Sequence, residues 1–252
     1  MRLPSVDEFT QVRRLFPVLA ALLFVGALAL PMWTIDVHAV QYPDTVLHIR
    51  LYGYPRITGD YAEMATLNHY IGFYYPDPVF VEPNFDVHEN AVAVPEWSLG
   101  PLAFVGCAAT GLFVAVAPTT AKLRKGLFAQ LAGTVAVFAG MMALIQYRLY
   151  EVGHSLDPGA PVMGVDGFTP PLWGKYEVAN ITSYSRFGAG AYVSMLAVVL
   201  LVVAFRYRHE TATPRDLVAA LGNLEPGAVR RRLPGVGGDD AGASADEHAR
   251  GD

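Results

Sequence analysis

The sequence predicts an α-helical integral membrane protein with four transmembrane helices and a small α+β outer domain built from two extracytoplasmic loops. Three observations predict this fold class. The chain contains four apolar stretches of about 20 residues, the length that spans a bilayer core of roughly 30 Å as a helix. Only 16% of the 252 residues are charged, whereas a soluble domain usually carries about 25%. The segments between the apolar stretches carry charge of alternating sign.

The four predicted spans are residues 15–33, 97–117, 126–149 and 187–205. A backbone in lipid satisfies its hydrogen bonds only as a helix or a closed barrel. Uniformly apolar runs favour helices, because barrel strands alternate over about 10 residues. The first run also resembles a cleavable signal peptide, since Arg13 and Arg14 precede it and residues 27–29 read A-x-A. Its length and Trp33, a typical interface residue, favour an uncleaved anchor.

The distribution of Lys and Arg predicts the orientation. Residues 1–14, the connector 118–125 and the tail 206–252 together hold 13 of the 18 basic residues. The positive-inside rule therefore places these three segments in the cytoplasm, and residues 34–96 and 150–186 outside it. The expected location is the cell membrane, with a multi-pass topology and both termini cytoplasmic.

The first outer segment, residues 34–96, carries nine acids and reads as folded. Residues 34–39 alternate polar and apolar side chains, the period of a half-buried strand, and residues 46–52 read as a returning strand. Tyr42-Pro43-Asp44 supplies turn chemistry between them. We expect a hairpin, with His38 and His48 facing each other near its ends.

A short helix is predicted after the hairpin. Asp60 can cap its start, and Glu63 three residues later completes a box-like pattern. Gly72 can end the helix at about Tyr70 or Ile71. Prolines break the pattern beyond it, so residues 73–96 are expected to form an ordered loop that returns to the membrane.

The second outer segment, residues 150–186, is rich in Pro and Gly, which excludes long regular elements. Its aromatic residues argue against disorder. We expect a packed loop that rests on the first outer segment and completes one outer domain. In the tail, a short helix should begin near Thr213 and end at Leu221, and disorder is expected after about residue 234.

Histidines gather in the outer segments, which contain His88 and the four histidines among the candidate ligands below. Imidazole binds copper and zinc well, and Met sulfur adds affinity for Cu(I). The candidate copper ligands are His38, His48, His69, His154 and Met64. No H-x-x-x-H, H-x-H or C-x-x-C spacing occurs, so folding would have to assemble any site. The alternative is that these are ordinary surface, packed or loop-anchoring residues.

No motif for catalysis is present in the sequence. It lacks a G-x-S-x-G elbow, a P-loop and a C-x-x-C-H haem site. The predicted spans place no ionisable residue at mid-depth, where functional charges of transporters and channels lie. These observations favour a non-enzymatic protein with a passive membrane anchor.

Three strings resemble one known family. They are residues 39–43 (AVQYP), residues 67–72 (LNHYIG), and residues 153–158 (GHSLDP) with 167–172 (GFTPPL). Together they resemble NosB-type multi-span membrane proteins, which are encoded beside nitrous-oxide reductase and its copper-maturation genes. The resemblance covers about residues 15–205, and Val40 replaces an expected Pro. The motif residues in this chain are Gln41, Tyr42, Pro43, Asn68, His69, Tyr70, Gly72, His154, Asp157 and Pro158.

The resemblance implies a role in nitrous-oxide respiration, but it brings no established reaction or catalytic residue. We therefore expect a non-enzymatic membrane accessory protein that sits in the lipid bilayer and binds no nucleic acid. Its outer domain would dock nitrous-oxide reductase or its copper-maturation proteins and handle copper. One alternative is a quinol-linked electron-transfer subunit, although the spans lack the paired histidines of a diheme bundle. The other is a permease component, against which the few polar residues of the spans argue.

Overall fold

The computed structural model describes residues 5–77, 79–81, 91–162 and 167–222. The chain divides into two compact units, Met1–Ala212 and Thr213–Asp252. The second unit contains helix α7 (Pro214–Gly222), whose first turn is capped where Asp216 accepts hydrogen bonds from the backbone N–H and hydroxyl of Thr213. The disorder expected after residue 234, and His88, lie outside the described residues.

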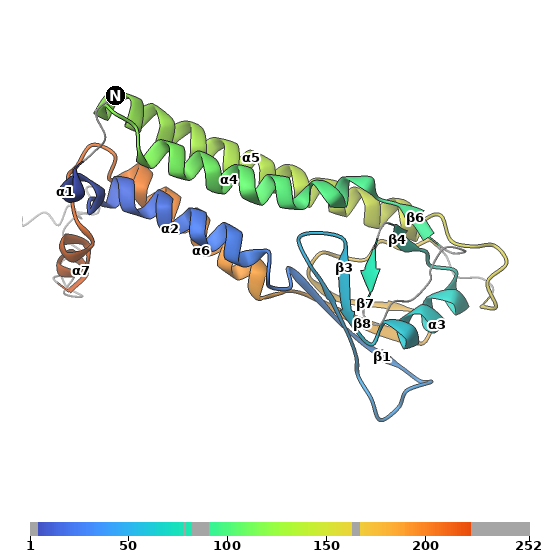
Figure 1. Cartoon of the computed structure of the whole chain (residues 1–252). Helices are drawn as coiled ribbons and strands as arrows, with labels where there is room; N and C mark the ends of the chain where they lie inside the picture. The colour runs from blue at the N-terminus through green and yellow to red at the C-terminus, as the bar shows by residue number, and fades with distance from the viewer. Residues whose placement is uncertain (1–4, 78, 82–90, 163–166, 223–252) are drawn as a thin grey trace, which may run out of the picture. The chain divides into compact units, whose positions relative to one another are not determined.

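The first unit contains a helical bundle made of α2, α4, α5 and α6 (Figure 1). Helix α2 packs along α4 and α6, and α5 packs along the same two helices. Rings of Phe24, Phe104 and Phe138 meet in its core, with centroids 5.2 to 6.5 Å apart. A one-turn helix, α1 (Val6–Phe9), precedes α2, and a 3-10 turn, η2 (Pro95–Leu99), precedes α4. The bundle helices are α2 (Val12–Ala27), α4 (Gly100–Ala115), α5 (Thr120–Gly153) and α6 (Ala189–Arg206).

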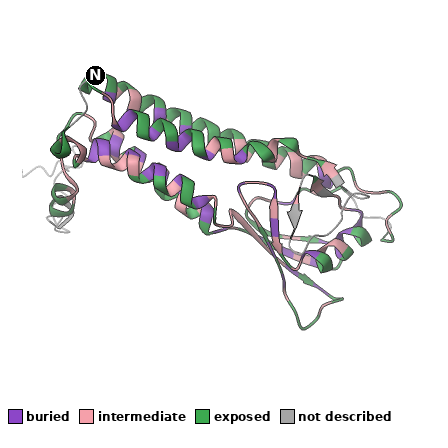
Figure 2. Cartoon of the chain, in the orientation of Figure 1, coloured by how far each residue is buried: buried purple, intermediate pink, exposed green. Residues whose placement is uncertain are grey.

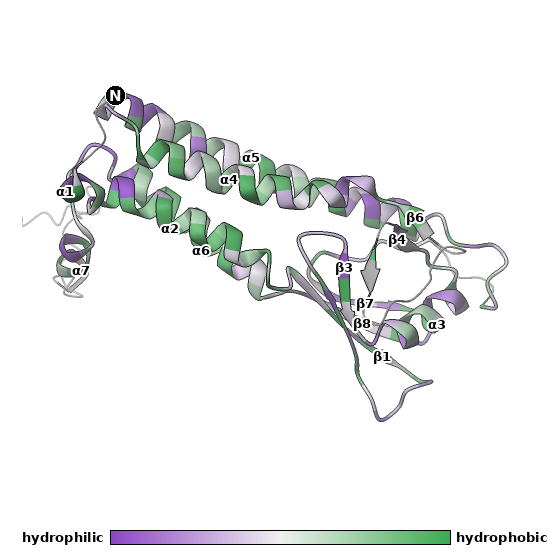
Figure 3. Ribbon diagram, viewed as in Figure 1, coloured by the Kyte–Doolittle hydropathy of each residue, from purple (hydrophilic) through white to green (hydrophobic). Residues whose placement is uncertain are grey.

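Three helical segments of the described chain are long and apolar enough to cross a membrane, by length and composition: Pro95–Ala115, Thr120–Gly153 and Ala189–Arg206. Their outward faces are exposed and hydrophobic (Figures 2 and 3). Phe113 on α4 is 75% exposed and Phe128 on α5 is 61% exposed. Because large apolar patches on a protein surface mark contact with lipid or another protein, these faces fit a bilayer environment.

The helix bounds differ from the predicted spans. Helix α2 ends at Ala27, and Trp33 begins a strand instead of closing the helix. Helix α5 starts at Thr120, six residues before the predicted span, because the Thr119 hydroxyl caps it by accepting a hydrogen bond from the Lys122 N–H. Its 34 residues give a length of about 51 Å, which exceeds the bilayer core. Helix α6 begins at Ala189, since Phe187 is the last residue of a strand.

Charged side chains connect the ends of the bundle helices to neighbouring elements. Buried Arg14 of α2 donates from Nη1 to the carbonyl oxygens of Ala115 and Ala117, at 2.6 and 3.0 Å, and so satisfies the end of α4. At the opposite end of α4, Arg148 of α5 pairs with Glu96 of η2 and with Glu151, at 2.7 Å for the second pair. These contacts fix α4 against its neighbours at both ends.

The first unit also contains a six-stranded sheet with the strand order β5-β3-β2-β1-β8-β7. All neighbouring strands are antiparallel except for the parallel pair β3-β5. The predicted hairpin is present as β1 and β2, with Asp36 opposite His48. Two further strands, β4 (Tyr75–Asp77) and β6 (Ala91–Ala93), form a separate parallel pair where a loop was expected. The strands of the large sheet are β1 (Trp33–Ala39), β2 (Leu47–Leu51), β3 (Arg56–Gly59), β5 (Phe80–Val81), β7 (Gly174–Val178) and β8 (Ile181–Phe187).

Strands β7 and β8 correct the interpretation of residues 150–186 as a loop. Pro and Gly are confined to the part of this segment up to Gly174, and beyond it polar and apolar side chains alternate. The two strands join through a two-residue turn in which Ala179 has a φ of +52°. Strand β8 then pairs with β1, so the end of the second outer segment lies inside the sheet of the first.

Helix α3 (Tyr61–Ile71) covers one face of the sheet. Leu67 and Ile71 of the helix pack on Val37, Leu47 and other inward side chains of the strands. The helix ends as predicted, at Gly72 in the left-handed conformation. Its start differs from the expected capping box, because the Asp60 carboxylate accepts a hydrogen bond from the backbone N–H of His48, at 2.8 Å, instead of capping α3.

The two outer segments join at the end of α3. The Gly72 carbonyl accepts a hydrogen bond from the Asp157 N–H, at 2.9 Å, and the Tyr70 carbonyl accepts one from the Val162 N–H, at 3.0 Å. Phe73 and Phe168 stack beside this joint with ring centroids 5.6 Å apart. The second segment therefore rests on the first through backbone hydrogen bonds and apolar packing.

Candidate functional site

The second face of the sheet carries polar side chains and is not covered by α3. Alternation along each strand sends Val37 and Leu47 into the core under α3 and their neighbours to the opposite side. We call this second side the open face. The side chains on it include Thr34, Asp36, His38, His48, Arg50, Thr58, Lys175, Glu177, Thr182, Tyr184 and Arg186.

Asp36 connects three strands on the open face. Its Oδ1 accepts a hydrogen bond from Nδ1 of His48, at 2.8 Å, and its other oxygen pairs with the guanidinium of Arg186. The Asp36 side chain is only 16% exposed, while both partners are more than half exposed. Because a carboxylate only accepts, the contact places the His48 proton on Nδ1 and leaves Nε2 available to a partner.

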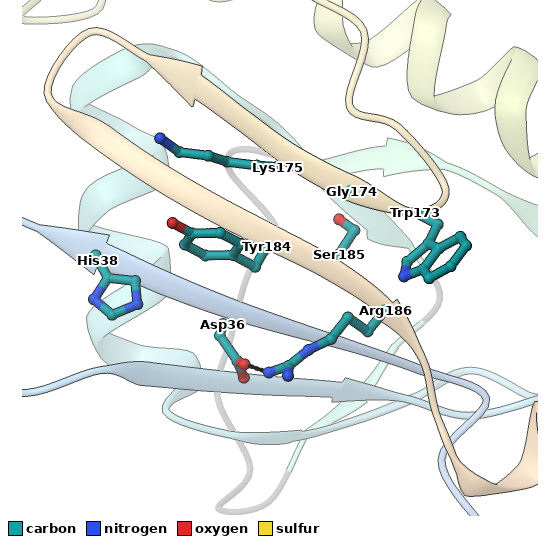
Figure 4. A pocket seen from close by; sticks show the side chains of 8 residues that line it. All are labelled: Asp36, His38, Trp173, Gly174, Lys175, Tyr184, Ser185 and Arg186. Carbon is teal, nitrogen blue, oxygen red and sulfur yellow. Dashed lines mark ion pairs between the residues drawn. The ribbon is translucent and has the colours of Figure 1, made fainter.

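An open pocket of about 380 Å³ lies on this face (Figure 4). Strands β1, β7 and β8 build it, together with Trp173 just before β7. The His38 and Tyr184 rings meet edge to face on one side, with centroids 5.7 Å apart. The lining residues are Asp36, His38, Trp173, Gly174, Lys175, Tyr184, Ser185 and Arg186.

The pocket lining contains two cations and one carboxylate. Arg186 is shared with Asp36, and Lys175 Nζ lies 2.5 Å from Glu177 Oε1 at the pocket edge. The hydrogen bond between Lys175 and Glu177 raises the pKa of the amine and lowers the pKa of the carboxyl group, so both stay charged at neutral pH. Ser185 is 1% exposed and alternates with Tyr184 and Arg186 along β8, so its side chain lies on the opposite side of the sheet from theirs.

The pocket lies at the end of the sheet that joins the bundle. Strand β8 ends at Phe187 and α6 begins two residues later. Trp173, which is 68% exposed, stacks on Phe187 with ring centroids 6.3 Å apart. Gly188 is required in the connection because an added Cβ would lie 2.2 Å from the Pro31 carbonyl oxygen. The site therefore lies next to the start of α6.

The structure places two of the predicted copper ligands on the open face, but not opposite each other. His48 faces Asp36, and His38 faces Thr182 of β8. This corrects the expected pairing of the two histidines. The strand register explains the difference, because β2 pairs with β1 in a register that puts Leu47 opposite Val37.

The other predicted ligands occupy different surroundings. His69 is exposed on α3, whereas Met64 of the same helix is partly buried in the core under the sheet. His154 follows α5, where its Nδ1 lies 2.8 Å from the Tyr150 carbonyl oxygen and its ring stacks on the Tyr150 ring. Within the described ranges, no group of three or more His, Cys, Asp or Glu side chains could hold a metal ion.

The family-like strings contribute mainly to the joint between the outer segments. Asn68 is buried near the end of α3, and its carbonyl accepts a hydrogen bond from the Phe73 N–H. The Asp157 carboxylate accepts one from the Gly159 N–H, which orders the turn around exposed Pro158. Tyr42 packs on the core from the hairpin turn, while its neighbours Gln41 and Pro43 are exposed.

Sequence reasoning missed most of the pocket. Lys175, Tyr184 and Arg186 lie on strands that were expected to be loop, and only the alternation of residues 175–187 could have indicated them. It also missed a polar pair inside the bundle. Gln130 and Thr134 of α5 are at most 5% exposed, and the side-chain amide of Gln130 has no hydrogen-bond partner in the described chain, whereas the Thr134 hydroxyl lies beside the Cys107 thiol.

No family model, curated protein or solved structure matches this chain in the comparisons with known proteins. Function is therefore inferred from the geometry of the open face and from the three family-like strings.

Proposed function

We propose that this protein is a non-enzymatic membrane accessory protein of nitrous-oxide respiration, whose outer domain docks nitrous-oxide reductase or its copper-maturation proteins. The observation that carries the docking role is the uncovered polar face of a six-stranded sheet whose opposite face is packed by α3. Cross-strand contacts through Asp36 hold the side chains of this face in place. A preorganised surface of this kind loses little conformational freedom when a partner binds.

The anchor in this proposal has four spans, with α2 as the fourth. Helix α2 is only 16 residues long, but Ala20, Phe24 and Ala27 are fully buried between its neighbours. Because α2 packs along α4 and α6, both of which are candidate spans, it lies at the same depth as they do. The basic connector between α4 and α5 then faces the cytoplasm, and the sheet faces outward.

The docking surface shares His38 and Tyr184 with the pocket and extends away from Arg186 and Trp173. It consists of His38, His48, Glu177, Thr182 and Tyr184. Tyr is enriched in interfaces because its ring buries a large area and its hydroxyl still finds a partner. His48 offers its free Nε2, since Nδ1 is already bound to Asp36.

The link to nitrous-oxide respiration comes from the family-like strings. Two of them, residues 67–72 and 153–158, meet in the hydrogen bond between Gly72 and Asp157. This contact brings the two strings together at one place in the outer domain. The described residues present no assembled copper-ligand group, so the proposal assigns docking as the role of the outer domain.

Photocrosslinking in cells that respire nitrous oxide tests the proposal. A p-benzoylphenylalanine at His38 in the full chain should crosslink to the reductase or to one of its copper-maturation proteins, identified by mass spectrometry. The matched control replaces Ala62, an exposed residue of α3 on the other side of the sheet, and should yield no such product. Equal products at both positions, or none at His38, would contradict docking on the open face. A deletion strain that reduces nitrous oxide at the wild-type rate would contradict the assigned pathway.

A further inference from the structure

We infer that the pocket between β1, β7 and β8 binds the headgroup of an acidic phospholipid from the adjacent membrane leaflet. This inference concerns the end of the open face next to α6, and it does not depend on the protein partner proposed above. Three observations support it: the level of the pocket relative to the membrane, the charge of its lining, and the aromatic surface beside it.

The position of the pocket along the membrane normal matches the headgroup layer. Helix α6 has 18 residues and a length of about 27 Å, close to the hydrocarbon thickness of roughly 30 Å. Arg186 stands two residues before the N-cap Gly188, which is about 7 Å along an extended chain. Since the polar layers add about 5–7 Å on each side of the core, the guanidinium lies at headgroup level.

The charge of the lining suits a phosphodiester. The lining contains two cations, Arg186 and Lys175, and one carboxylate, Asp36, while Glu177 pairs with Lys175 from the pocket edge. A guanidinium carries five N–H donors, so the pair with Asp36 leaves donors for a phosphate oxygen, and its planar fork matches phosphate geometry.

The aromatic surface distinguishes a lipid from a free phosphate. Trp173 is 68% exposed and stacks on Phe187 at the side of the pocket nearest α6. Trp is enriched where a protein crosses the membrane–water interface, because the indole combines an apolar body with one polar N–H. A ligand that meets both cations and this ring is amphipathic, as a phospholipid is at its glycerol region.

Native mass spectrometry of the full chain, released from detergent in the presence of defined lipids, tests the inference. The wild-type protein should retain phosphatidylglycerol in preference to phosphatidylcholine, and Arg186→Gln should weaken this retention about tenfold, the loss expected for one charge-assisted hydrogen bond. Arg50→Gln is the matched control, because Arg50 is on the same face but does not line the pocket. Equal retention of the two lipids, or equal loss in both variants, would overturn the inference.

A second variant protects the test from a folding artefact. Arg186→Gln also removes the ion pair with Asp36, whereas Trp173→Ala leaves that pair intact and should still weaken retention of phosphatidylglycerol. Unchanged retention in Trp173→Ala would remove the aromatic contribution and with it the lipid assignment. Soluble glycerol phosphate at the same concentration should fail to displace the lipid; displacement would identify a site for free phosphate instead.

Discussion

At the scale of single residues, glycine conformation decides whether the outer domain can assemble. Gly72 has a φ of +75°, which ends α3, and its carbonyl accepts the hydrogen bond from Asp157. An added Cβ at this position would lie 2.8 Å from the Asp157 nitrogen. The sequence predicted the helix end from this glycine, but its second role, close contact with the other outer segment, required the folded chain.

Gly72→Ala should therefore lower the stability of the protein by about 1–3 kcal/mol, the usual cost of a left-handed conformation in a non-glycine residue. The thermal unfolding midpoint of the purified protein in detergent measures the effect. Gly140→Ala on α5 is the control, because its added Cβ meets nothing within 4 Å and Ala favours helices. A midpoint for Gly72→Ala equal to that of the control would show that the joint tolerates a side chain.

At the scale of elements, local patterns predicted some segments and missed others. The β1–β2 pair and helix α3 follow from alternation and from turn or helix-ending residues, and the structure contains both. Strands β7 and β8 were missed because Pro and Gly in the first half of their segment outweighed the alternation in the second half. Helix α5 extends beyond its apolar run, since the cap at Thr119 and the ion pair of Arg148 with Glu151 extend it into polar sequence.

The polar pair inside the bundle leads to a prediction about α5. Gln130 packs against Gly111 of α4, where an added Cβ would lie 2.6 Å from its Nε2. Because both polar atoms of the Gln130 amide are buried without partners in the described chain, Gln130→Leu should stabilise the protein by about 1–3 kcal/mol. The unfolding midpoint in detergent is the readout, and Gln146→Leu near the outer end of α5 is the control. A lower midpoint in Gln130→Leu would mean that the amide has a partner in the native bundle.

At the scale of the whole molecule, the three long apolar helices and the polar sheet need different surroundings, although they belong to one chain. Exposed phenylalanines on α4 and α5 require an apolar surrounding, whereas the charged open face requires water or a polar partner. A membrane at the bundle satisfies both conditions. The sorting of Lys and Arg then indicates which side each end of α5 faces.

Cysteine labelling in intact cells checks this topology. In a Cys107→Ser background, Ser155→Cys should react with a membrane-impermeant maleimide, and Ala121→Cys should react only after permeabilisation. Both positions are exposed and lie at opposite ends of α5, about 51 Å apart by helix length. Labelling of Ala121→Cys in intact cells would contradict the proposed orientation.

The sequence by itself determined the apolar helices, the hairpin and the end of α3, because these depend on the period of side chains along a short stretch and on glycine at one point. It also indicated that the polar outer segments lie together, through the spacing of the apolar runs. Only the tertiary structure decided the pocket and the open face. Asp36, His48 and Arg186 come from three strands, and β8 is separated from β1 by the whole of α4 and α5. Contacts between residues so distant in sequence depend on strand order and register, which no local period specifies.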